Sequence, residues 1–97
     1  MKTLASALAA YQIASTVYVA AFDACDWATM EDAEFDAAML VCDDAQAAMN
    51  SAAVEVVNAA IAEAKRHGKP TNDLEVMLTK PAYYKALAER ASAPATK

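Results

Sequence analysis

The larger apolar side chains of the first 25 residues recur at alternating spacings of four and three. This spacing places them on one helix face, as in the heptad repeat of coiled coils, and predicts a helix over residues 3–25. Ile13 and Val17 add a second apolar edge and Val19 a third, so we expect this helix to be central or covered by a second copy of the protein. The stripe consists of Leu4, Leu8, Tyr11, Ser15, Tyr18, Phe22 and Cys25.

A second periodic segment follows a break at residues 26–29. Thr29 is a good N-cap residue, and acids follow it in the first turn, where they suit the helix dipole. Bases in the last turn and Gly68 after them predict an end near His67. The helix expected over residues 30–67 is about 57 Å long at 1.5 Å per residue, and we expect it to be continuous, with a kink allowed near Asn50. Its stripe is Phe35, Met39, Cys42, Met49, Ala53, Val56 and Ala60, with Gln46 as a gap.

The last third predicts shorter elements. Asn72 can cap a short helix over residues 73–78, and Pro81 suits the first position of a last helix that ends near Ala91. Alanine dominates the apolar residues, the chain has one glycine and three prolines, and no segment alternates as a strand would. We therefore predict an all-α fold: a long antiparallel helical hairpin with two short helices packed at one end, forming one domain over residues 1–91 with a flexible tail at 92–97.

Charge is distributed unevenly along the chain. Residues 1–64 hold one base against ten acids, and residues 65–97 hold seven bases against three acids. The negative potential of unneutralised acids steers a protein towards basic partners. An acidic helical face is thus the candidate protein-binding surface, although it could simply be solvated, or the C-terminal bases could fold back and neutralise it. Its candidate residues are Glu34, Asp36, Asp43, Asp44 and Glu55.

Catalytic and metal-binding patterns are not evident in the sequence. His67, the single histidine, is expected at an exposed helix end without a nucleophile at a defined spacing. The acids lack the inward-facing histidines at i, i+3 that metal sites in helical bundles recruit. One glycine does not make a phosphate-binding loop, and seven dispersed bases do not make a nucleic-acid surface. We predict no enzymatic activity, no metal or cofactor, and no direct nucleic-acid contact.

The two cysteines and the uncharged N-terminal segment bear on the location of the protein. Cys25 and Cys42 are expected at different heights of the hairpin, as free thiols in a reducing cytosol. The uncharged residues 3–22 could instead form a signal peptide or a membrane span. Polar interruptions such as Gln12, together with the heptad, favour a core helix of a soluble cytoplasmic protein.

Three aromatic residues are candidate interface anchors, since tryptophan and tyrosine are enriched at protein interfaces. Trp27, in the interhelical turn, is expected to plug the end of the bundle. Of Tyr83 and Tyr84, at most one can face the core squarely, and the other is the better interface candidate. We assign that role to Tyr84.

In size, acidity, alanine-rich helices and lack of catalytic residues, the whole chain resembles small proteins encoded by bacteriophages and mobile elements, the anti-CRISPR proteins among them. The likeness is one of overall character and carries no diagnostic motif. It implies a cytoplasmic inhibitor that binds the basic surface of a host protein or ribonucleoprotein, such as a CRISPR surveillance complex, and blocks DNA access or recruitment. The alternative is a structural homo-oligomer, such as a homodimer, or a phage assembly component built on the heptad of the first helix.

Overall fold

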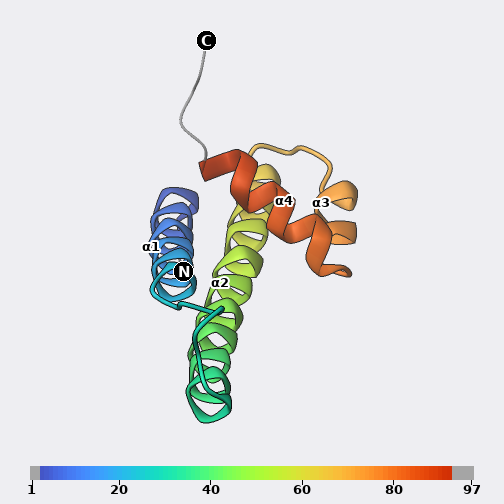
Figure 1. The fold of residues 1–97 in the computed structure, drawn as a ribbon. Helices are drawn as coiled ribbons and strands as arrows, with labels where there is room; N and C mark the ends of the chain where they lie inside the picture. The colour runs from blue at the N-terminus through green and yellow to red at the C-terminus, as the bar shows by residue number, and fades with distance from the viewer. Residues whose placement is uncertain (1–2, 93–97) are drawn as a thin grey trace.

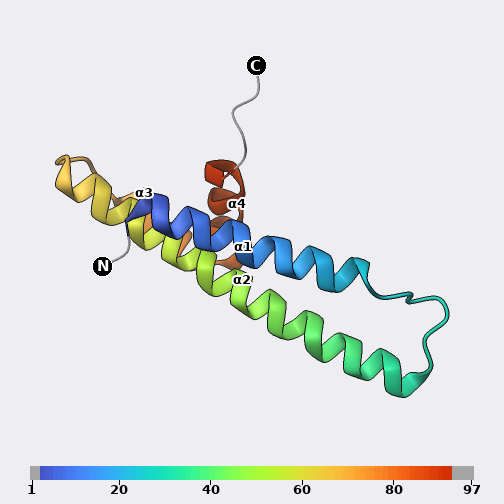
Figure 2. The same cartoon turned by 90° about the vertical axis from the view of Figure 1, so that its left-hand side faces the viewer.

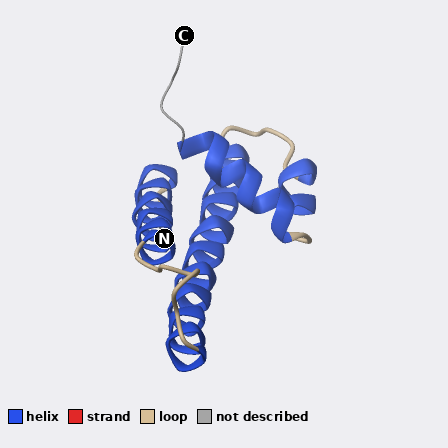
Figure 3. Ribbon diagram, in the orientation of Figure 1, coloured by secondary structure: helices blue, strands red, loops and turns tan. Residues whose placement is uncertain are grey.

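A computed structural model describes residues 3–92, and this part of the chain contains four helices and no strand. The helices are α1 (Leu4–Asp23), α2 (Asp32–Arg66), α3 (Asn72–Met77) and α4 (Pro81–Ser92). Helices α1 and α2 lie side by side as a long antiparallel hairpin, and the two short helices pack at the end where α2 finishes (Figures 1 and 3). The predicted all-α hairpin with two short C-terminal helices is therefore confirmed.

Helix α2 is continuous over 35 residues, with no break at Asn50. At 1.5 Å per residue it extends for about 52 Å, close to the 55 Å longest dimension of the molecule. Its end is the predicted one: bases occupy the last turn, and Gly68 follows with a φ of 68°. A left-handed residue after the last turn is favourable for glycine because it lacks a Cβ.

The core lies where α1, α2 and α4 meet. Tyr11 and Val56 are its largest fully buried side chains, and one fully buried alanine from each helix packs beside them: Ala7, Ala53 and Ala88. These methyl side chains let the three helix backbones approach closely. The side-chain amide of Gln12 donates to the Ser92 carbonyl at 2.9 Å and links α1 to α4.

The predicted start of the second helix is wrong by two residues. Helix α2 begins at Asp32, and its N-cap is Glu31, whose side chain makes no capping bond. Thr29 lies in the preceding turn, where its hydroxyl donates to the Asp26 carbonyl at 3.4 Å. The packing of Trp27 accounts for the difference, because its ring lies between those of Phe22 and Phe35, with centroid separations of 5.3 and 5.6 Å.

The same aromatic cluster confirms that Trp27 plugs the end of the hairpin at which the loop joins α1 and α2. The ring of Tyr18 lies 6.4 Å from that of Phe22 and extends the cluster along α1. Such tilted and edge-to-face pairs are worth about 0.5–1.5 kcal/mol each beyond the area they bury. Tertiary packing of these rings therefore sets the path of the interhelical loop.

The expectation that the two cysteines would not meet is wrong. The Cys25 thiol is close enough to that of Cys42 to raise its pKa, and both are free thiols; the hydrogen bond of the Cys25 thiol goes to the Ala21 carbonyl at 3.2 Å. The reason is the asymmetry of the hairpin: α1 stops early, and the loop runs on past it to the far end of α2 (Figure 2). The first residues after α1 thus face α2 about three turns beyond its start.

Three of the four ends of the two short C-terminal helices lie one residue away from their predicted positions. Helix α3 starts one residue early with Thr71 as its N-cap, and the Thr71 hydroxyl donates to Glu75 Oε2 at 2.8 Å. Pro81 is the first residue of α4, as predicted. Ser92, where the predicted tail begins, is the last residue of α4, and residues 93–97 lie outside the described part of the chain.

Candidate protein-binding surface

The helical repeat of α2 separates the five predicted acids into distinct positions. All five are exposed. At about 100° per residue, Asp36 and Asp43 lie on one line, seven residues apart, while Asp44 and Glu55 lie on a line about 100° further round. Glu34 is about 160° from Asp36. The five acids therefore do not form one face, and three of them, Asp36, Asp43 and Asp44, lie together.

Leu40 is at the centre of these three acids, and sequence reasoning missed it. It precedes Asp43 and Asp44 by three and four residues and follows Asp36 by four, and such positions are neighbours on a helix surface, with Cβ atoms about 5–6 Å apart. Its side chain is 66% exposed. The signal was present in the sequence as a leucine with acids at i−4, i+3 and i+4, on the face opposite the apolar stripe.

We call Asp36, Leu40, Asp43 and Asp44 the acidic patch. It faces away from α1, because Leu40 precedes the core residue Met49 by nine residues. At about 100° per residue, nine residues place the two side chains on opposite sides of the helix. The chain contains no basic residue between positions 3 and 64. Around an exposed apolar side chain, these carboxylates form a surface that can receive a basic partner with an apolar contact at its centre.

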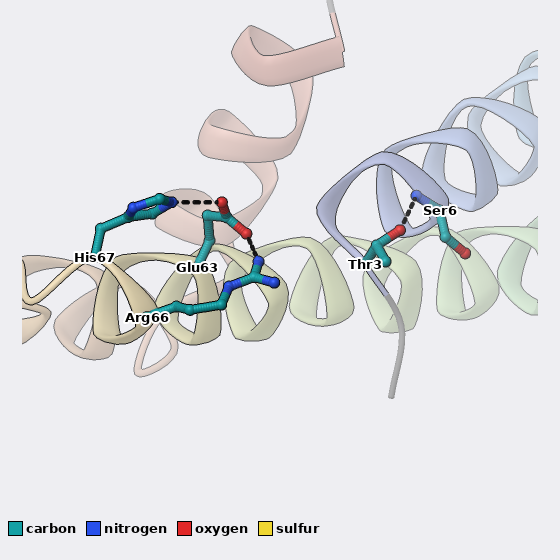
Figure 4. A network of polar contacts seen from close by, with 5 residues as sticks. All are labelled: Thr3, Ser6, Glu63, Arg66 and His67. Atoms are coloured by element: carbon teal, nitrogen blue, oxygen red, sulfur yellow. Dashed lines mark hydrogen bonds and ion pairs between the residues drawn. The ribbon is translucent and has the colours of Figure 1, made fainter.

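Among the described residues, no base of the C-terminal third forms an ion pair with the acidic patch. Within residues 3–92, every ion pair involves Glu63, which pairs with Arg66 three residues on and faces His67 Nε2 at 3.0 Å (Figure 4). All three side chains lie in the last turns of α2, at the opposite end from the patch. His67 is exposed there, as predicted.

The exposed member of the tyrosine pair is Tyr83, so the choice of Tyr84 as the surface anchor was wrong. Tyr84 packs against the core beside Ala88, whereas Tyr83 is 46% exposed and lies below Lys80, whose Nζ is 5.8 Å from the ring centroid. The register of α4 on α2 decides between the two rings, and adjacent tyrosines carry no sequence signal for that register.

The rest of the described surface has less defined chemistry. A groove of about 340 Å³ between α3 and α4 is lined mainly by apolar side chains, among them Val76 and Leu87, together with Asp73 and Arg90. Among the described residues, no group of three or more histidine, cysteine or acidic side chains is placed to hold a metal ion. The acidic patch remains the surface with the most defined chemistry.

The chain was compared with protein-family models, curated proteins and solved structures. None of the three comparisons gave a match.

Proposed function

We propose that this protein is a non-enzymatic inhibitor that docks its acidic patch onto a basic protein surface of a host nucleic-acid-binding assembly, acting in the host cytoplasm. One observation carries the proposal: an exposed leucine on α2 is surrounded by three carboxylates that have no ion-pair partner in residues 3–92. Like charges at these spacings cost stability. Their presence is therefore better explained by a partner than by folding.

The chemistry of the patch favours a protein target over nucleic acid. Carboxylates repel phosphates, whereas nucleic-acid-binding proteins display clustered lysine and arginine. Leu40 adds what a phosphate mimic alone lacks, an apolar centre with a polar rim, which is the general anatomy of protein–protein interfaces. Occupation of such a surface would exclude DNA or RNA from it, as the resemblance to anti-CRISPR proteins implies for a CRISPR surveillance complex.

A structural homo-oligomer or phage assembly component is the second candidate function. The heptad stripe on which this alternative was based packs against α2 within the chain, since Tyr11 is buried there and Leu4, Leu8 and Tyr18 lie against the same core. What favours the candidate instead is the opposite face of α1, which is apolar, uncharged and exposed.

The test begins by capturing the tagged protein and its partners from bacterial lysate with and without nuclease. The captured complex is then purified, and its nucleic-acid binding is titrated against the protein. In cells with active CRISPR interference, phage plaquing is scored with and without expression. A nucleic-acid-processing complex that is retained after nuclease and loses DNA binding supports the proposal, and recovery of the protein alone contradicts it.

Two double variants distinguish an effect of the acidic patch on binding from an effect of net charge. The reversal Asp43→Lys with Asp44→Lys should weaken target binding at least tenfold and leave the helical circular dichroism unchanged. The matched control, Glu34→Lys with Glu55→Lys, alters net charge by the same amount outside the patch and should weaken binding much less. Equal losses in the two variants would show that long-range steering, not the patch, drives binding, and retained inhibition by the first would overturn the assignment.

A further inference from the structure

The outward face of α1 is a second surface that the core does not use. Ile13 follows Tyr11 by two residues and therefore points about 200° away from it. Ile13 is 68% exposed and Val17 is 54% exposed, although both are large apolar side chains. With Ala9, Gln12 and Thr16 they line a shallow hollow of about 370 Å³.

The outward face of α1 carries no charge. No charged residue occurs between Thr3 and Phe22, and the buried residues of α1 are Ala7 and Tyr11. By length and composition α1 could also cross a membrane. The expectation that α1 would be central within its own chain was wrong, since α2 and α4 cover one side of it and leave the other side to solvent.

The area of the chain leaves room for an interface of standard size. The chain exposes 6669 Å², whereas a compact monomer of 10.2 kDa is expected to expose about 5,300 Å². Elongation accounts for part of the difference. A standard interface removes about 800 Å² from each partner, which fits within the excess.

The charge distribution indicates that a second copy of the chain covers the outward face of α1. The N-terminal end of α1 lies beside the C-terminal end of α2, where Thr3 and Leu4 share a groove with Glu63, Lys65 and Arg66. Glu63 pairs with Arg66, and Lys65 leaves this group of three with a net positive charge. The other end of α1 leads into Asp23 and the acidic loop. A second copy packed antiparallel on α1 would therefore bring each acidic end next to a basic end, whereas a parallel copy would place like charges together.

We propose that the outward face of α1, centred on Ile13 and Val17, is the interface of an antiparallel two-fold homodimer. The interface is isologous, so each copy contributes the same uncharged side chains. The acidic patch faces away from α1, so the dimer would carry two patches on its outer sides. The proposal does not depend on the nature of the target of those patches.

Analytical ultracentrifugation of the full chain over a wide concentration range tests the dimer. The wild-type mass should rise with concentration to twice the monomer mass. Ile13→Glu and Val17→Glu should each weaken the dimer at least tenfold, because each places a carboxylate at the interface. Val76→Glu is the matched control, since Val76 on α3 is 55% exposed, and it should leave the dimer unchanged. Circular dichroism checks that each variant is folded.

Salt dependence tests the orientation. If the copies are antiparallel, added salt screens attraction between opposite ends and weakens the dimer, whereas a parallel pair would be strengthened. A monomer at all concentrations, a dimer indifferent to both glutamate variants, or a dimer strengthened by salt would each overturn the proposal. Binding of the monomer to phosphatidylcholine–phosphatidylglycerol vesicles, lost in Ile13→Glu, would also overturn it and assign the face to a membrane.

Discussion

Replacement of Tyr11 by phenylalanine tests the account of the core most directly. The ring of Tyr11 is the largest side chain in the contact between α1, α2 and α4, and it is 2% exposed. Its hydroxyl is buried and has no hydrogen-bond partner among the described residues. Phenylalanine keeps the ring and removes only the oxygen.

The expected effect is a gain in stability. A buried polar group without a partner costs about 1–3 kcal/mol of desolvation, and the loss of one oxygen atom leaves a small void that offsets part of the gain. We therefore expect Tyr11→Phe to raise the free energy of unfolding by about 1 kcal/mol, which for a domain of this size raises Tm by about 4–8 °C. Urea denaturation at pH 7, with an unchanged m-value, measures the difference.

The pH dependence of the free energy of unfolding is an independent test of the burial of the same hydroxyl. Burial, and to a smaller extent the Glu89 carboxylate, raises the pKa of Tyr11 above its ordinary value of 10.0. The folded chain then holds this proton to higher pH than the unfolded chain does. Stability from this source is full below pH 10 and is lost as pH rises through the folded-state pKa. The advantage of Tyr11→Phe should therefore grow above pH 10.

Tyr83→Phe is the control, because its side chain is exposed, and it should change the free energy of unfolding by less than about 0.5 kcal/mol. A loss of about 1 kcal/mol or more in Tyr11→Phe would refute the reasoning, since it would mean that the hydroxyl is hydrogen-bonded in the folded protein.

Three further predictions concern the core, a helix cap and the thiols. Val56→Ala should cost about 2 kcal/mol in urea denaturation, because it removes two fully buried carbons at about 0.8 kcal/mol each and leaves a cavity; an equal loss in the exposed Val41→Ala would contradict this. Thr3→Ala should lower stability by about 1 kcal/mol in a thermal melt, because the Thr3 hydroxyl accepts the Ser6 amide at 3.1 Å and caps α1 (Figure 4). Limiting iodoacetamide should modify Cys25 before Cys42, as read by peptide mass spectrometry, because burial and then the neighbouring Cys25 thiol raise the pKa of Cys42; preferential labelling of Cys42 would refute it.

The two proposed surfaces can be tested separately because they lie on different helices. Loss of target binding in the Asp43→Lys, Asp44→Lys variant should leave the mass of the dimer unchanged. Conversely, Ile13→Glu should abolish the dimer and leave each monomer with an intact acidic patch. A variant that failed in both assays would indicate that the two surfaces are coupled.

The sequence alone was sufficient for the four helices and for their ends to within two residues. The features that specify the helices act between residues close together in the chain, so local interactions determine them. These features are the alanine-rich composition, the apolar stripes of residues 3–25 and 30–67, Gly68 and Pro81. The separation of acids from bases is likewise a property of the chain itself. The sequence left open whether the C-terminal bases would fold back onto the acids of the second helix.

The tertiary structure decided what depends on contacts between distant residues. The docking of Trp27 between Phe22 and Phe35 moved the start of α2 from residue 30 to Asp32, and the early end of α1 brought Cys25 near Cys42. The register of α4 turned Tyr84 inward and Tyr83 outward.

The same holds for the two surfaces. Periodicity shows that α1 is apolar nearly all round, but only the packing of α2 and α4 shows which side stays exposed, the side of Ile13 and Val17. An unbroken α2 likewise sets Leu40 among Asp36, Asp43 and Asp44 and separates Glu34 from them. Local sequence specifies each helix, and the relative placement of helices is settled by long-range packing, which no short segment encodes.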